Sequence, residues 1–86
     1  MPLRVDFSAR AAKKIRAYDR RTRLRIGAAL EEIAANPYTP QHSRPLSGQL
    51  KGKWRYRLGG LRIVYETDEA EGIVWVKAVE SRGQVY

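Results

Sequence analysis

The amino-acid sequence predicts an α+β domain in the order β-α-α-β-β-β, with a helical hairpin packed on one face of a small, antiparallel-rich sheet. Two observations support this prediction. Apolar side chains recur at helical spacing up to residue 35, and the period of the pattern changes to two after residue 53. With 86 residues, the chain is long enough for one hydrophobic core and too short for two, so residues 1–86 are expected to form a single domain.

The first expected elements are a short strand and a helix. Residues 3–7 (LRVDF) alternate apolar and polar side chains, which is typical of a half-buried strand. Ser8 follows this strand and is suited to accept a hydrogen bond from the first turn of a helix over residues 9–17. Helical spacing then brings Ala12 and Ile15 onto one face, and we expect this face to point to the core.

A second, longer helix is expected to follow at once. Asp19 can cap its start, and the helix should end near Ala35, because the Asn36-Pro37 pair disfavours helical backbone. Four apolar side chains recur at helical spacing within it and should face the core: Ile26, Leu30, Ile33 and Ala34. Two helices joined by so short a connection form a helical hairpin.

The second half of the chain predicts a loop and then three strands. Residues 36–52 hold three of the four prolines, and this composition is typical of a loop. The following strands are expected at residues 54–58, 61–67 and 73–79, separated by Gly59-Gly60 and by DEAEG at residues 68–72.

The two-residue turn at Gly59-Gly60 fixes the register of the first two of these strands. The expected opposite pairs are Leu58–Leu61, Arg57–Arg62, Tyr56–Ile63, Arg55–Val64 and Trp54–Tyr65. Because side chains alternate between the two faces of a sheet, the large apolar side chains of these pairs share the core face. Arg55, Arg57 and Arg62 then share the opposite face, and Lys53 lies one step further along, opposite Glu66.

The charge and composition exclude several classes of protein. Seventeen basic against nine acidic residues give a net charge of +8, which favours a polyanionic partner, nucleic acid first and acidic protein second. Cysteine is absent, so thiol chemistry and thiolate metal sites are excluded. The longest apolar run, IVWV at residues 73–76, is far too short to span a membrane. We therefore expect a soluble, cytoplasmic protein.

The arginines on the open sheet face are the best candidates for function. Arg57 opposite Arg62 places like charges side by side, at a cost of roughly 0.2–1 kcal/mol that fold stability alone does not explain. A single strand arginine would be interpreted as a solvated surface residue. Three on one face favour anion binding, because guanidinium groups donate bidentate hydrogen bonds to phosphate oxygens and stay charged at any relevant pH.

The other residue types leave little room for a metal or a cofactor. His42 is the only histidine, and the acidic residues gather in the 68–72 turn, so neither a metal site nor a Ser-His-Asp assembly is supported. No phosphate-binding GxxxxGK[ST] loop is present. A site of arginine, lysine and tyrosine can still cleave RNA without metal, because the substrate supplies its own nucleophile, the 2′-hydroxyl.

The run LKGKWRYRLGGLRIVYETD, together with the terminal SRGQVY, resembles the RelE/ParE superfamily of toxins from type II toxin–antitoxin systems. The resemblance covers nearly the whole chain and implies a RelE-like fold, related to that of the microbial ribonucleases. It also implies two alternative targets. RelE-like members are mRNA interferases that cleave messenger RNA in the ribosomal A site and inhibit translation, whereas ParE-like members poison DNA gyrase.

The resemblance to the RNA-cutting branch implies five catalytic positions. They are Arg55, Arg57, Arg62, Arg82 and Tyr86. Well-studied members often carry lysine at the positions of Arg55 and Arg57, and arginine is a poor general base. The base and the acid are therefore left open, with Tyr86 and Lys53 as candidates.

A second group of basic residues is expected to bind RNA or the ribosome. It consists of Lys53, Lys13, Lys14, Arg20, Arg21, Arg23 and Arg25. The expected partners are a cognate antitoxin, the ribosome and messenger RNA, with no membrane, metal or cofactor involved. We expect a metal-independent endoribonuclease. The alternatives are a gyrase inhibitor, or a non-catalytic RNA-binding module on the same fold.

Overall fold

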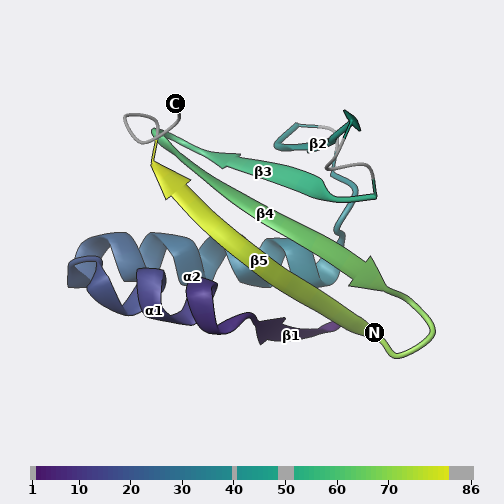
Figure 1. The fold of residues 1–86 in the computed structure, drawn as a ribbon, viewed down its shortest axis with the longest axis horizontal. Helices are drawn as coiled ribbons and strands as arrows, with labels where there is room; N and C mark the ends of the chain where they lie inside the picture. Colours follow the sequence, from purple (N-terminus) through teal and green to yellow (C-terminus); the bar gives the residue numbers. More distant parts are fainter. Residues whose placement is uncertain (1, 40, 49–51, 82–86) are drawn as a thin grey trace.

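The computed structural model describes residues 2–39, 41–48 and 52–81. Within them, seven elements follow each other along the chain: β1 (Arg4–Phe7), α1 (Ala9–Ala17), α2 (Arg20–Ala35), β2 (Ser43–Pro45), β3 (Trp54–Leu58), β4 (Leu61–Asp68) and β5 (Ile73–Ser81). The strands form one mixed sheet in the order β1-β5-β4-β3-β2. Figure 1 shows both helices on the same side of this sheet. The α+β prediction is confirmed.

Both helices begin at the predicted capping residues. The Ser8 side chain accepts a hydrogen bond from the Ala11 amide, and the Asp19 side chain accepts one from the Thr22 amide. Ser8 also donates its hydroxyl hydrogen to the Lys77 carbonyl in β5, at 2.9 Å. The start of α1 is thereby tied to an inner strand of the sheet as well as capped.

The sheet differs from the prediction in two ways. β1 pairs with β5 in parallel, whereas all other neighbours are antiparallel. The three-residue strand β2 lies within the segment that was predicted to be a loop, and it pairs with β3. That prediction was wrong because proline is compatible with a strand at the edge of a sheet, where Pro45 needs no ladder hydrogen bond on its outer side.

The core lies between the helices and the inner face of the sheet. The four apolar residues predicted for α2 are all buried, together with Ala29. In α1 the prediction was wrong by one position, because the buried residue is Ala11, with Ile15 partly buried against the core. Residues 11 and 15 are one helical turn apart and so face the sheet together.

Tyr56 reaches across the core from β3 to α2. Its side chain is buried, and its hydroxyl donates a hydrogen bond to Glu32 Oε2 at 3.0 Å. Burial, followed by this contact with a carboxylate, raises the pKa of Tyr56 to about 12. The neutral phenol is therefore the form that the fold stabilises.

This shift predicts a loss of stability at alkaline pH. The unfolded chain releases the phenol proton near pH 10, and the folded chain releases it near pH 12, so the free energy of unfolding should fall between these values. Below about pH 10 the contribution is fully present. Urea unfolding of the wild type and of Tyr56→Phe, measured from pH 9 to pH 11.5, checks this. The wild type should lose stability relative to the variant as pH rises, and parallel curves would contradict the prediction.

Within the described part of the chain, neither helix is long and apolar enough to cross a membrane.

Candidate functional site

On the face of the sheet opposite the helices, the adjacent strands β2, β3 and β4 carry a cluster of four arginines. The register of β3 and β4 agrees with all five predicted pairs, so Arg57 lies opposite Arg62 and Arg55 lies opposite Val64. β2 adds Arg44, which lies opposite Arg55 on the other side of β3. We call Arg44, Arg55, Arg57 and Arg62 the arginine face. Its members come from three adjacent strands. They share one face because each occupies an outward position of the two-residue strand repeat.

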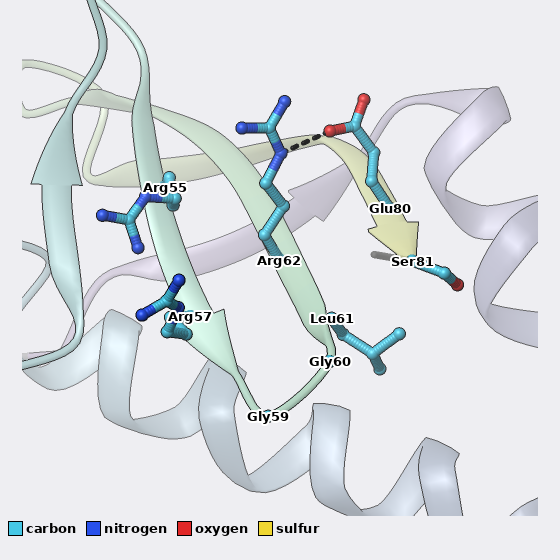
Figure 2. A pocket seen from close by; sticks show the side chains of 8 residues that line it. All are labelled: Arg55, Arg57, Gly59, Gly60, Leu61, Arg62, Glu80 and Ser81. Atoms are coloured by element: carbon cyan, nitrogen blue, oxygen red, sulfur yellow. Dashed lines mark hydrogen bonds and ion pairs between the residues drawn. The ribbon is translucent and has the colours of Figure 1, made fainter. Parts of the chain in front are cut away.

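An open cleft of about 620 Å³ lies against this face. It is lined by Arg55, Arg57, Gly59, Gly60, Leu61, Arg62, Glu80 and Ser81. Figure 2 shows Arg55 and Arg57 on β3, Arg62 beside them on β4, and Glu80 on β5. The sheet thus brings together the three arginines that the sequence predicts from strand alternation.

One carboxylate lies within this basic cleft. Glu80 is the cross-strand partner of Arg62, and the Arg62 Nε–H donates to Glu80 Oε1 at 2.5 Å. The two side chains are 33% and 28% exposed, so solvent screens the pair and its contribution to stability is modest. Arg62 therefore lies between a cation, Arg57, and an anion, Glu80.

The electrostatics of the cleft favour an anionic ligand. Burial, followed by repulsion from Arg57, Arg44 and Arg62, lowers the pKa of Arg55. Arginine stays protonated in spite of such a shift, so the repulsion persists in the folded protein. A phosphate group placed among these guanidiniums would relieve the repulsion and accept several charge-assisted hydrogen bonds.

The remaining predicted residues lie elsewhere. Lys53 Nζ forms an ion pair with Glu66 Oε1 at 3.1 Å on the same sheet face. Lys13 and Lys14 on α1 line a second cavity of about 360 Å³ together with Arg10, Ala17, Val79 and Glu80. Glu80 thus borders both cavities.

Four arginines lie within the first two turns of α2. Arg20, Arg21 and Arg23 lie near its start, and Arg23 donates to the Tyr18 carbonyl at 3.0 Å. Arg25 reaches the turn between β3 and β4, where its Nη2 lies 2.9 Å from the position that a Cβ atom would take at Gly59. Arg25 therefore connects the basic helix to the rim of the cleft. Arg82 and Tyr86 lie outside the described residues.

Two residues of this site were missed at the sequence level. Arg44 was missed because its segment was interpreted as a loop. Glu80 was missed because the five-residue turn before β5 does not fix the register of that strand as a two-residue turn does. A bulge that shifts the register between Val64 and Tyr65 adds to this ambiguity. If the alternation of side chains is continued from Arg62 across to β5, Glu80 is a candidate for the same face of the sheet.

Alanine substitutions at the two glycines of the turn that lines the cleft should differ in their effect on stability. Gly59 has a φ of 58°, so alanine there is strained and its Cβ would crowd Arg25. We expect Gly59→Ala to lower the free energy of unfolding by about 1–2 kcal/mol. At Gly60 no atom lies within 4 Å of a new Cβ, so Gly60→Ala should stay within about 0.5 kcal/mol of the wild type. Urea unfolding of the two variants checks this, and equal losses would contradict it.

Comparison with known proteins identifies the family. The family model described as "ParE toxin of type II toxin-antitoxin system, parDE" matches residues 5–86. The chain belongs to this family. The resemblance of the sequence to the RelE/ParE superfamily is thereby confirmed, and this ParE-family chain is a toxin of a toxin–antitoxin system. A search of curated proteins found no match.

Solved structures show the same fold in related toxins. The RelBE2 toxin–antitoxin complex from Mycobacterium tuberculosis contains a chain with a TM-score of 0.85 and 22% identity, over 95% of this chain and 100% of that one. A chain of the archaeal RelE–RelB complex from Pyrococcus horikoshii has a TM-score of 0.80 and 19% identity, over 99% of this chain and 100% of that one. The isolated E. coli RelE toxin has a TM-score of 0.77 and 25% identity, over 92% of this chain and 83% of that one. The ParE-family chain therefore has the RelE fold.

Proposed function

We propose that this toxin is a metal-independent endoribonuclease that cleaves messenger RNA in the ribosomal A site and thereby inhibits translation. The observation that carries the proposal is the convergence of Arg55, Arg57 and Arg62 on one open cleft. Such a group of planar donors suits a phosphodiester. The likeness to the E. coli RelE toxin supports the same assignment.

In the proposed reaction the arginines supply positioning and charge stabilisation. Their N–H groups would bind the two non-bridging oxygens of the scissile phosphate, where negative charge grows in the transition state. The 2′-hydroxyl attacks phosphorus in line, and the products are a 2′,3′-cyclic phosphate and a 5′-hydroxyl. Arg82 is proposed as a further phosphate ligand, and Tyr86 as a platform on which a base stacks, a contact typically worth about 1–3 kcal/mol.

A second group of basic residues is proposed to hold the ribosome. Lys13, Lys14 and the α2 arginines Arg20, Arg21, Arg23 and Arg25 would contact ribosomal RNA, with Lys53 at the edge of the arginine face. Phosphate contacts of this kind release counterions, so binding should weaken steeply with salt. Lys53 would have to exchange its contact with Glu66 for a phosphate.

A cognate antitoxin is proposed as the physiological inhibitor. The similar structures from M. tuberculosis and P. horikoshii are toxin–antitoxin complexes. An acidic or amphipathic segment that covers the arginine face would block the cleft and offset its charge. Because the antitoxin binds the folded toxin, it would also raise the apparent stability of the toxin.

The family match favours a second candidate function. The matching family is described by the name ParE, and the ParE-like branch of the superfamily inhibits DNA gyrase. In that case the arginine face would bind a protein or DNA, and no residue of the cleft would need to take up or release a proton.

One paired experiment distinguishes the two functions. Ribosomes programmed with messenger RNA and an empty A site are incubated with the toxin, and cleavage is mapped by primer extension. A gyrase supercoiling assay is run with the same preparation. Cleavage within the A-site codon supports the endoribonuclease, whereas intact messenger RNA with blocked supercoiling would move the toxin to the gyrase-directed branch.

A further inference from the structure

Glu80 places in the cleft a carboxylate, a group that as an anion only accepts hydrogen bonds and offers none to a phosphate. It lies on β5 at the border of the arginine cleft and of the α1 cavity, and it contacts Arg62. A negative charge at this place repels an anionic ligand and so weakens the property for which the cleft is suited. Its presence calls for a function other than binding.

Among the described residues that line the cleft, Glu80 differs from the others in proton chemistry. The arginines stay protonated at any relevant pH and cannot accept a proton. The remaining lining residues are Gly59, Gly60, Leu61 and Ser81, none of which is a base at neutral pH. In the described part of the cleft, Glu80 is therefore the one side chain that can accept a proton from a substrate hydroxyl.

The contact with Arg62 places the Glu80 carboxylate beside the guanidinium that the proposed reaction uses. Arg62 uses its Nε–H for Glu80 Oε1, and within the described residues its Nη groups make no further hydrogen bond. Figure 2 shows the Arg62 guanidinium next to the Glu80 carboxylate, on the same side of the sheet as Arg55 and Arg57. A phosphate held by the Arg62 Nη groups would have the adjacent 2′-hydroxyl within reach of Glu80 Oε2, which has no partner among the described residues.

We propose that Glu80 is the general base of RNA cleavage, an inference that rests on the proposed endoribonuclease function. Glu80 Oε2 takes the proton of the 2′-hydroxyl as the bond from the 2′-oxygen to phosphorus forms. The bond between phosphorus and the 5′-oxygen breaks, and the leaving oxygen takes a proton from water. Glu80 then returns its proton to the solvent, so the net reaction is a transesterification that needs neither metal nor oxidant.

Cations surround the carboxylate from each element packed near it. Arg62 lies on β4, Arg55 and Arg57 lie on β3, and the α1 cavity that Glu80 borders adds Arg10, Lys13 and Lys14. These charges offset part of the repulsion between the Glu80 carboxylate and the substrate phosphate.

The substitution Glu80→Gln separates this role from the alternatives. The amide oxygen of glutamine can still accept the Arg62 Nε–H, so the position of Arg62 is kept while the base is lost. Single-turnover cleavage on programmed ribosomes should fall by roughly 10²–10⁴-fold. Binding of a non-cleavable messenger RNA analogue with 2′-deoxyribose at the cleavage site should be unchanged or a few-fold tighter, because one negative charge is removed. Glu71→Gln in the exposed β4–β5 turn is the matched control and should behave as the wild type.

The base assignment requires that Glu80→Gln slow cleavage without weakening binding. If Glu80→Gln cleaves at the wild-type rate while Glu80→Ala is slow, Glu80 acts by positioning Arg62 and the base assignment is wrong. A loss of binding in Glu80→Gln, with a native circular dichroism spectrum, would overturn it as well. If the wild type itself leaves messenger RNA intact, the proposed endoribonuclease function fails, and the base fails with it.

Discussion

Arg62→Ala is expected to reduce cleavage of messenger RNA by roughly 10²–10³-fold, the usual effect of removing one donor to the developing charge of a transition state. Arg62 is the central residue of the cleft, with Arg57 on one side and Glu80 on the other. Its removal takes away the donors nearest to the proposed base and also the ion pair with Glu80. Single-turnover primer extension on programmed ribosomes measures the effect.

The fold should survive this substitution, because the Arg62–Glu80 pair is partly exposed and the other residues of β4 remain. The matched control is Arg4→Ala, which removes another arginine that pairs with a carboxylate, Asp6, at a site with 70% exposure of the arginine side chain. The control should cleave as fast as the wild type. Wild-type cleavage by Arg62→Ala would show that the arginine cleft is not the site of the reaction.

Tyr65→Ala is expected to lower the free energy of unfolding by about 3–5 kcal/mol, as for other fully buried aromatic side chains. Tyr65 on β4 has 0% exposure. Its hydroxyl donates to the Pro37 carbonyl at 2.5 Å and lies 2.8 Å from Ser43 Oγ at the start of β2. One side chain thus fills the core and also fastens the segment after α2, including the strand that carries Arg44.

Two further variants separate these contributions. Tyr65→Phe keeps the ring and removes the hydroxyl, so it should cost about 1–3 kcal/mol through the buried polar groups left unpaired. Tyr38→Phe is the control, because the Tyr38 hydroxyl bonds Thr67 and Glu69 at the surface, and it should stay within about 0.5 kcal/mol. Urea denaturation measures all three. A loss below 1 kcal/mol in Tyr65→Ala would contradict the core position of Tyr65.

Local interactions explain which parts of the fold were predictable. The helix starts at Ser8 and Asp19 depend on contacts three residues away, and the β3–β4 register depends on a two-residue turn. Such features are encoded in short stretches of chain, so residue types alone determine them. The arginine face was predictable for the same reason, since Arg55, Arg57 and Arg62 belong to that one hairpin.

Contacts between distant segments set the rest. The parallel pairing of β1 with β5, the short strand β2 and the pair between Arg62 and Glu80 each join residues whose register no short turn dictates. A three-residue strand has too weak a preference of its own and forms because β3 offers it an edge and Tyr65 holds its first residue. The sequence therefore specifies an arginine-rich sheet face in a toxin of this family. Tertiary packing adds Arg44 and places the Glu80 carboxylate against Arg62.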